Sequence, residues 1–243
     1  MMTQSPVAVV TGASRRLGFE TCVALMERGY RVYALFRTDT TELELLRGKG
    51  ARCIPVDLAD ALSVSKAIES IVEEADTIRL LVNNASEFLP DETEAGGLAG
   101  QAARLFQINS IAPMQLMAGL ASSLCREARQ TGRPSLIVNI TDIYTEKPNP
   151  KFATYCASKA ALSNLTLSYA KLLAPHVRVN AIMPGPISFL PTHSEEHRAG
   201  VMTETLLPWE GGFNSVVLQL LALLDNDFMT AALIPVDGGR RLT

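Results

Sequence analysis

Short runs of β-branched and other apolar residues alternate along the chain with segments of helical periodicity. The apolar runs predict strands at residues 7–10, 31–36, 52–56, 80–83, 136–140, 177–182 and 231–236. The segments between them predict helices at residues 17–28, 40–49, 61–74, 98–106, 113–130, 153–174 and 213–224. Strands that are apolar on both faces and separated by helices are typical of a parallel sheet covered on both sides. The pattern therefore predicts an α/β fold with a doubly wound parallel sheet.

No repeat, low-complexity segment or linker interrupts this alternation, so we expect residues 1–243 to form a single domain. Residues 188–212 depart from the periodic pattern because they are rich in Pro, Gly, Glu and His. We interpret them as a mobile loop with room for one short helix.

Composition narrows the classes of function. Hydrophobic residues make up 47% of the 243 residues, charged residues make up 19%, and the formal net charge is −3. These values do not favour a nucleic-acid-binding or a polybasic membrane-binding surface. No apolar run approaches the roughly 20 residues that span a bilayer, and no signal or transit peptide is recognisable at the start. The four cysteines are scattered, which favours reduced thiols over disulfides or a metal site, and we expect a cytoplasmic protein.

A glycine-containing turn follows the first predicted strand and opens the first predicted helix. Residues 11–18 read TGASRRLG, in the position where α/β sheets hold a pyrophosphate on backbone amides and the positive end of a helix. Gly12 and Gly18 allow close approach of the backbone. This position favours a dinucleotide site over an ordinary strand-to-helix turn.

The end of the second predicted strand indicates which dinucleotide binds. An acidic residue commonly holds the ribose 2′-hydroxyl of NAD at this point, whereas this chain has Arg37 followed by Thr38. A guanidinium can hydrogen-bond a 2′-phosphate through two nitrogens, and Arg15 adds a second positive charge in the glycine turn. We therefore predict NADPH rather than NADH. Asp39 lies close by, and a solvated surface arginine is the alternative interpretation of Arg37.

Tyr155 and Lys159 are the first candidates for chemistry. Four residues apart on a predicted helix, they lie on one face, where an ammonium beside a phenol favours the phenolate and lowers the tyrosine pKa towards neutrality. Asp142 precedes Tyr155 by thirteen positions and would act on the tyrosine pKa in the opposite sense. The alternatives are a surface pair for the helix residues and a turn-capping role for Asp142.

His193 and His197 have the spacing of two metal ligands on one helix turn. No third ligand is evident from the sequence. We therefore interpret them as exposed loop residues and predict no metal site.

These motifs together resemble the short-chain dehydrogenase/reductases over essentially the whole chain. Besides the glycine turn and the tyrosine–lysine pair, the resemblance rests on Asp57-Leu58, Asn83-Asn84-Ala85, Asn109, Pro184-Gly185 and Val236-Asp237-Gly238-Gly239. It implies a Rossmann-type domain, commonly tetrameric, that transfers hydride from a nicotinamide. It also implies catalytic roles for Tyr155, Lys159 and Asn109, the last at a helix kink. The implied coenzyme contacts are Gly12, Arg15, Arg16, Leu17, Gly18, Arg37, Thr38, Asp57, Leu58, Asn84, Ala85, Tyr155, Lys159, Pro184, Gly185 and Ile187.

Several positions depart from the general pattern of that family and resemble its pteridine reductases, including bacterial dihydromonapterin and dihydrofolate reductases. Arg16 replaces the middle glycine of the first turn, Ser86 replaces a glycine, and Asp142 replaces the usual serine. The resemblance implies a pterin slot formed by Arg16, Ser86, Phe88, Asp142 and Tyr155, with the pterin ring between Phe88 and the nicotinamide. Core packing is the alternative interpretation of Phe88.

The sequence thus predicts an NADPH-dependent reductase of a dihydropterin such as dihydromonapterin, with dihydrofolate as a further candidate and a homotetramer as the expected assembly. Reduction of a C=N bond requires a hydride at carbon and a proton at nitrogen, and Tyr155 tuned by Lys159 and Asp142 is placed to handle that proton. One rival is a short-chain reductase of another carbonyl or imine. The other is a nucleotide-sensing regulator without turnover, which would not need an intact tyrosine–lysine pair.

Overall fold

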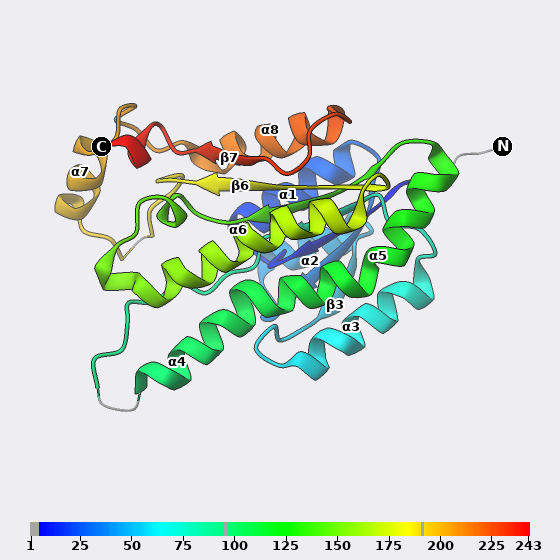
Figure 1. Ribbon diagram of the computed structural model, residues 1–243, viewed down its shortest axis with the longest axis horizontal. Coiled ribbons are helices and arrows are strands. Elements are labelled where there is room, and N and C mark those ends of the chain that lie inside the picture. The colour runs from blue at the N-terminus through cyan, green and yellow to red at the C-terminus, as the bar shows by residue number, and fades with distance from the viewer. Residues whose placement is uncertain (1–4, 95–96, 191) are drawn as a thin grey trace.

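The computed structural model describes residues 5–94, 97–190 and 192–243, and within them all seven strands belong to one parallel sheet (Figure 1). The strand order is β3-β2-β1-β4-β5-β6-β7. The strands are β1 (Val7–Thr11), β2 (Arg31–Phe36), β3 (Arg52–Pro55), β4 (Leu80–Asn83), β5 (Ser135–Ile140), β6 (Val177–Pro184) and β7 (Leu233–Val236). The order reverses between β1 and β4, and the carboxyl ends of neighbouring strands at such a reversal form the usual ligand crevice of this architecture.

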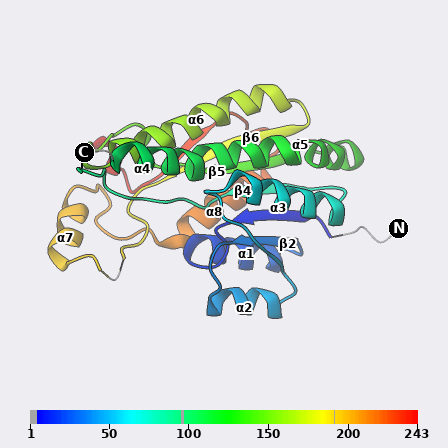
Figure 2. The ribbon, with the colours of Figure 1, turned by 90° about the horizontal axis from the view of Figure 1, so that it is seen from below.

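Helices cover both faces of the sheet, as Figure 2 shows. They are α1 (Arg16–Glu27), α2 (Thr41–Gly48), α3 (Ala61–Glu74), α4 (Gly97–Phe106), α5 (Ala112–Thr131), α6 (Ala153–Leu173), α7 (Glu195–Thr203) and α8 (Gly212–Asp225). One hydrophobic core joins the sheet to α3, α5 and α6, and a second joins it to α1, α2 and α8. The predicted doubly wound α/β fold is confirmed.

The central strands are buried because helices cover both of their faces, whereas the edge strands β3 and β7 are partly exposed. Every residue of β4 and β5 is buried, which explains their continuous apolar pattern. The segment 188–212 contains one short helix, α7, as expected. The structure adds a feature that the periodicity did not indicate: a π-helical turn at Gln107–Ile111 joins α4 directly to α5. A π-turn widens a helix locally and often occurs at functional sites.

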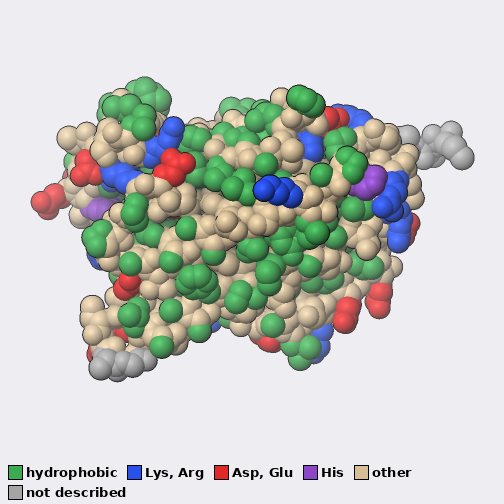
Figure 3. All heavy atoms as spheres, in the orientation of Figure 1, with side chains coloured by type: hydrophobic (Ala, Val, Ile, Leu, Met, Phe, Trp, Pro, Cys, Tyr) green, Lys and Arg blue, Asp and Glu red, His purple; other side chains and the backbone are tan. Residues whose placement is uncertain are grey.

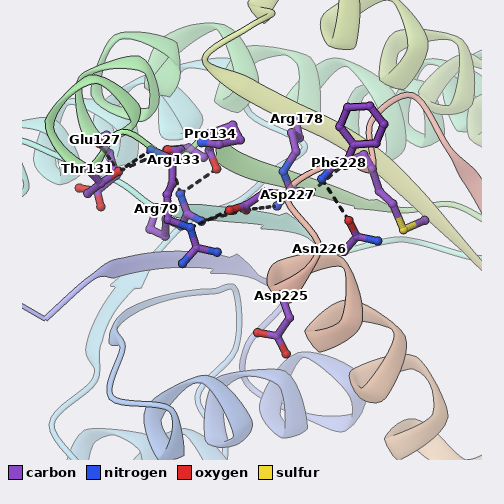
Figure 4. Close-up of polar contacts among 12 residues, drawn as sticks. Arg79, Glu127, Thr131, Arg133, Pro134, Arg178, Asp225, Asn226, Asp227 and Phe228 are labelled. Carbon is purple, nitrogen blue, oxygen red and sulfur yellow. Dashed lines mark hydrogen bonds and ion pairs between the residues drawn. The ribbon is translucent and has the colours of Figure 1, made fainter.

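Asp227 binds three arginines at the edge of the sheet opposite the ligand crevice (Figure 4). Its carboxylate accepts a 2.6 Å hydrogen bond from Arg133 and 3.4 Å hydrogen bonds from Arg79 and Arg178, which are buried near the starts of β4 and β6. Burial raises the pKa of Asp227, but the Arg133 hydrogen bond and the three arginine charges outweigh it, so the net shift is downward. One carboxylate therefore holds together three segments that are distant in the sequence.

Among the described residues, no helix is both long enough and apolar enough to cross a membrane.

Candidate active site

The glycine turn packs against the loop that follows β4. A Cβ atom on Gly18 would lie 2.0 Å from the carbonyl oxygen of Gly12, and one on Gly12, whose φ is +65°, would lie 3.0 Å from Cα of Ala85. The side-chain amide of Asn84 donates to the carbonyl of Thr11 at 2.8 Å, while the Thr11 hydroxyl accepts from the amides of Asn84 and Ala85 at 2.9 Å each. Glycine is therefore required at both positions, and the two loops form one rigid unit.

The first turn of α1 is available to an anion. The N-cap residue Arg15 has extended backbone and its side chain makes no capping hydrogen bond, so the first amides of α1 have no side-chain partner there. Arg16 adopts a left-handed conformation with φ +53°, and Leu17 and Gly18 behind it are buried. The Arg16 guanidinium donates to the carbonyl of Ser188 at 3.3 Å. Arg16 thus links the glycine turn to the loop that carries α7.

The end of β2 presents an exposed arginine. Arg37 and Thr38 follow the strand at its carboxyl end, and the Arg37 side chain is 55% exposed. The nearby Asp39 forms a 2.7 Å ion pair with Arg47 of α2. The Asp39 carboxylate is thus paired with Arg47, which also binds Glu44 of α2, and not with Arg37. This geometry agrees with the predicted preference for a phosphorylated ribose.

The remaining predicted coenzyme residues also lie in loops at the carboxyl edge of the sheet. Asp57 and Leu58 follow β3, and the Asp57 carboxylate accepts from the amide of Ala59 at 3.0 Å. Pro184 ends β6, and Gly185 contacts the Val236–Gly239 turn so closely that a Cβ atom would lie 2.7 Å from Cα of Asp237. Ile187 packs against the core on the α8 side. The structure brings these residues to the same edge of the sheet as the glycine turn.

The buried side chains of Tyr155 and Lys159 form a polar group with the partly buried Asp142. The Tyr155 hydroxyl donates to Asp142 Oδ2 at 2.7 Å, and Asp142 Oδ1 accepts from the amide of Tyr144 at 2.9 Å. Lys159, one turn after Tyr155 on α6, donates to the carbonyl of Ile140 at 2.8 Å. Asp142 therefore caps the turn after β5, as the alternative interpretation held, and also contacts the tyrosine.

Burial dominates the protonation equilibria of this group. It lowers the pKa of Lys159 to about 8, against the opposing effect of the Asp142 charge. Burial also raises the pKa of Asp142. It raises the pKa of Tyr155 well above its usual value, and the charge and hydrogen bond of Asp142 raise it further. The expectation that Lys159 lowers the tyrosine pKa towards neutrality is therefore wrong for this structure, because desolvation and the Asp142 carboxylate act more strongly.

Asn109 connects the site to the π-helical turn. Its side-chain oxygen accepts from the amide of Glu87 at 2.9 Å and from the hydroxyl of Ser86 at 3.2 Å. Its side-chain nitrogen donates to the carbonyl of Glu87 and to the hydroxyl of Ser158, both at 3.0 Å. The Ser158 hydroxyl in turn donates to the carbonyl of Tyr155 at 2.7 Å. Asn109 thus occupies the predicted irregular helix segment and fixes the loop after β4 relative to Tyr155.

Phe88 belongs to an aromatic cluster. Its ring stacks on Phe152 with 4.3 Å between centroids, and it meets the Tyr155 ring edge-on at 4.6 Å. Tyr144 lies 6.4 Å from both phenylalanine rings. Phe88 is nevertheless 46% exposed, so it is not a core residue. No motif in the sequence points to Phe152, which immediately precedes α6.

The prediction that His193 and His197 are both exposed loop residues is wrong in part: His193 precedes α7 and is partly buried, whereas His197 lies on α7 and is exposed. The ring centroids of His193 and His197 are 4.7 Å apart. No group of three or more His, Cys, Asp or Glu side chains that could hold a metal ion occurs in the part of the chain that the structure describes.

Comparison with known proteins places the chain in a family. The family model described as short chain dehydrogenase matches residues 6–199, and the chain belongs to that family. The family match confirms the predicted class of oxidoreductase that uses a nicotinamide coenzyme. By family and by fold, the chain is thus a short-chain dehydrogenase/reductase.

Individual relatives indicate which members of the family the chain resembles in sequence and structure. The chain is 30% identical over 243 residues, with all of both chains covered, to a dihydromonapterin reductase of Klebsiella pneumoniae. It is 30% identical to FolM alternative dihydrofolate reductase 1 of Brucella suis in complex with NADP, with a TM-score of 0.86 and coverage of 100% of this chain and 97% of the other. The RhlG/NADP active-site complex of Pseudomonas aeruginosa superposes with a TM-score of 0.88 at 25% identity, covering 98% and 97% of the two chains. These findings confirm the resemblance to pteridine reductases, and the NADP in both structures agrees with the predicted coenzyme.

Proposed function

We propose that this chain is an NADPH-dependent pteridine reductase, with residues 1–243 acting as one reductase domain. The substrate is a dihydropterin such as dihydromonapterin, and dihydrofolate is a further candidate. The observation that carries the proposal is the 2.7 Å hydrogen bond between Tyr155 and Asp142 beside Ser86 and Phe88. The names of the most similar relatives support the same substrate class.

The coenzyme fits the carboxyl edge of the sheet. The contact between Gly12 and Gly18 leaves no room for a Cβ atom, and the adjacent start of α1 offers free amides to a pyrophosphate. Arg15, Arg37 and Thr38 would hold the 2′-phosphate, and Asp57, Leu58, Asn84 and Ala85 would line the adenosine side. Tyr155, Lys159, Pro184, Gly185 and Ile187 would line the nicotinamide side. NADPH bound there supplies the hydride.

The raised pKa values suit proton transfer to a ring nitrogen. Tyr155 keeps its proton at neutral pH, and Asp142 holds a proton at higher pH than an exposed aspartate does. The two groups therefore form a coupled acid that can protonate nitrogen while carbon receives the hydride. Lys159 provides a nearby buried charge, and Asn109 holds Ser86 and the Tyr155 backbone in fixed positions.

Binding of a flat ring requires an aromatic face and planar donors. Phe88 rests on Phe152 and keeps 46% of its surface exposed, so it can stack on a bound ring. The Arg16 guanidinium lies at the opposite loop and presents donors suited to ring nitrogen or carbonyl acceptors. Ser86 adds a hydroxyl beside Tyr155. These groups would orient the pterin with its reducible bond towards the acid pair.

The decisive experiment compares substrates and one substitution. NADPH oxidation is measured with dihydromonapterin, dihydrobiopterin, dihydrofolate and an acetoacetyl thioester in parallel. We expect turnover of a dihydropterin by the wild type, and we expect Asp142→Ala to abolish it while NADPH binding, followed by fluorescence titration, is retained. Asp142→Ser is the matched control, because it installs the residue that the resemblance gives for other members of the family. Activity confined to the thioester, or full dihydropterin turnover by Asp142→Ala, would refute the proposal.

Arg37 is tested separately through coenzyme binding. We expect Arg37→Ala to weaken NADPH binding and to leave NADH binding nearly unchanged, because only NADPH carries the 2′-phosphate. Arg129→Ala, which removes an exposed arginine from α5, is the control. Equal NADPH affinity of the wild type and the Arg37 variant would exclude Arg37 from the phosphate site.

Homotetrameric assembly is also proposed. A groove of about 680 Å³ beside the edge strand β7 has Leu206, Leu207, Trp209 and Leu218 on its walls, each between 48% and 61% exposed. The face over α5 and α6 carries few charged side chains across its middle (Figure 3). Both surfaces could pack against further copies of the chain. Light scattering should give a mass near four times 26.3 kDa, and a monomeric mass would contradict this assembly. A cytoplasmic location stays a prediction from the sequence.

A further inference from the structure

An acidic side chain lies between two arginines at the coenzyme side of the site. Glu87 follows Ser86 in the loop after β4, and its carboxylate accepts hydrogen bonds from Arg104 at 2.7 and 3.0 Å. The guanidinium of Arg37 lies 3.8 Å from the same carboxylate. The Glu87 carboxylate thus brings together three segments: the end of β2 with Arg37, the loop that follows β4, and helix α4 with Arg104. None of the roles already assigned to the site uses Glu87 or Arg104.

The position of Glu87 is fixed by its backbone. Asn109 accepts from the amide of Glu87 and donates to its carbonyl, so the peptide on either side of the residue is held. The Glu87 side chain is only 20% exposed. The backbone contacts fix where the Glu87 side chain starts, and the two hydrogen bonds from Arg104 hold its carboxylate beside Arg37.

The two arginines are engaged to different degrees. Arg104 makes two parallel hydrogen bonds to the carboxylate, the geometry in which a guanidinium and a carboxylate interact most strongly. The hydrogen bond from Arg104 to Glu87 raises the pKa of Arg104, in spite of burial acting in the other direction. Arg37 is close enough for attraction, but it makes no hydrogen bond to Glu87 and stays 55% exposed. Arg104 thus compensates most of the Glu87 charge and leaves the Arg37 donors free.

We propose that Glu87 and Arg104 are positioning residues that set the affinity and selectivity for NADPH by controlling how far Arg37 is available to the 2′-phosphate. This inference rests on the proposed phosphate site at Arg37. An uncompensated Glu87 would bind Arg37 itself and repel the phosphate. Arg104 prevents both effects by occupying the carboxylate. Coenzyme choice in this chain therefore depends on a residue of α4 that does not touch the coenzyme.

The test is a double-mutant cycle read by equilibrium binding of NADPH and NADH to the coenzyme-free protein, followed by fluorescence titration. Exposed charge pairs contribute about 0.2–1 kcal/mol, which corresponds to changes of up to roughly fivefold in affinity. We expect Arg104→Gln to weaken NADPH binding roughly two- to fivefold and Glu87→Gln to strengthen it by a similar factor. The double substitution should return to near the wild-type affinity, because the carboxylate and its partner are removed together. NADH binding should change little in all three variants.

Two further variants separate a charge effect from a structural one. Arg104→Lys keeps the charge without the paired hydrogen bonds and should restore part of the lost NADPH affinity. Arg52→Gln breaks a similar hydrogen-bonded ion pair with Glu74, at the start of β3 and away from the carboxyl edge of the sheet, and should leave both affinities unchanged. The differences among the variants should shrink as salt concentration rises, because exposed charges are screened.

Three outcomes would overturn the inference: loss of NADPH and NADH affinity to the same extent, weakening of NADPH binding by Glu87→Gln, or failure of the double substitution to return towards wild type. These outcomes are distinct from a failure of the proposed function. If Arg37→Ala has no effect, the phosphate site itself is misplaced. If Arg37→Ala weakens NADPH binding and the Glu87 and Arg104 variants do not alter it, only the present inference fails.

Discussion

Replacement of Lys159 by methionine should change how the stability of the protein depends on pH. Lys159 is fully buried, and burial lowers its pKa from 10.5 to about 8. A folded-state pKa below the unfolded value means that the folded state disfavours the charged form. This lowers the free energy of unfolding, and the destabilisation is fully present below about pH 8. It diminishes as pH rises from about 8 towards 10.5, because in this range the unfolded chain binds more protons than the folded protein. Methionine keeps an unbranched side chain of similar length but does not titrate.

The magnitude follows from the two pKa values. Between about pH 7 and 9.5, proton linkage at this single site should stabilise the wild type by about 2 kcal/mol relative to Lys159→Met. Urea unfolding of both coenzyme-free proteins across this range measures the difference, and other titrating groups largely cancel because both proteins contain them. A nitrogen NMR titration of the Lys159 ammonium provides a second measurement, which should show a midpoint near pH 8.

Parallel stability curves for the two proteins over that range would refute the reasoning, as would a lysine midpoint near its ordinary value. Either result would mean that the ammonium is solvated or paired more strongly than the 2.8 Å hydrogen bond to Ile140 indicates. The methionine variant should bind and turn over substrate poorly in any case, so stability rather than activity is the informative readout.

Three further predictions follow from other contacts. Gly18→Ala should abolish coenzyme binding in a fluorescence titration, since its Cβ atom would meet the Gly12 carbonyl at 2.0 Å, whereas Gly100→Ala, with open space around it on α4, should bind normally. Asp227→Asn should cost about 2 kcal/mol in urea unfolding near neutral pH by weakening hydrogen bonds to charged arginines. Because the folded-state pKa of Asp227 is lowered, this cost should fade as pH falls through that pKa, and a constant cost would contradict it. Phe88→Ala should raise the KM for a dihydropterin more than it lowers kcat, and an unchanged KM would exclude stacking.

The fold could be predicted because each signal was local. Buried strands, the glycine turn and the helix carrying Tyr155 and Lys159 each depend on residues close together in the sequence. The π-helical turn at 107–111 does not follow from the periodicity, because the apolar spacing of a helix does not reveal a change in its hydrogen-bond pattern; only the family resemblance indicated a kink at Asn109. The apolar spacing therefore predicts separate helices at 98–106 and 113–130, whereas the structure joins α4 and α5 through that turn.

The parts of the site that escaped prediction depend on contacts across the sheet. Glu87 meets Arg37 and Arg104 because strand order places β2, β1 and β4 side by side, which no local pattern encodes. Phe152 has no motif and matters only through its stack on Phe88. The wrong direction for the Tyr155 pKa has a related cause. A sequence shows which charges are near a group along a helix, but it does not show how completely the fold removes water from that group.

The position of the Asp227 cluster affects how readily the substrate specificity of this protein can evolve. Its arginine partners lie at the amino edge of the sheet, opposite the carboxyl edge with the loops that carry Arg16, Phe88 and α7. Substitutions in the loops that alter substrate choice do not touch the Asp227 contacts. The stability that these contacts contribute is therefore retained and can offset destabilising substitutions at the active site. A laboratory search for altered substrate choice should therefore vary the loops freely and preserve the four residues of the cluster.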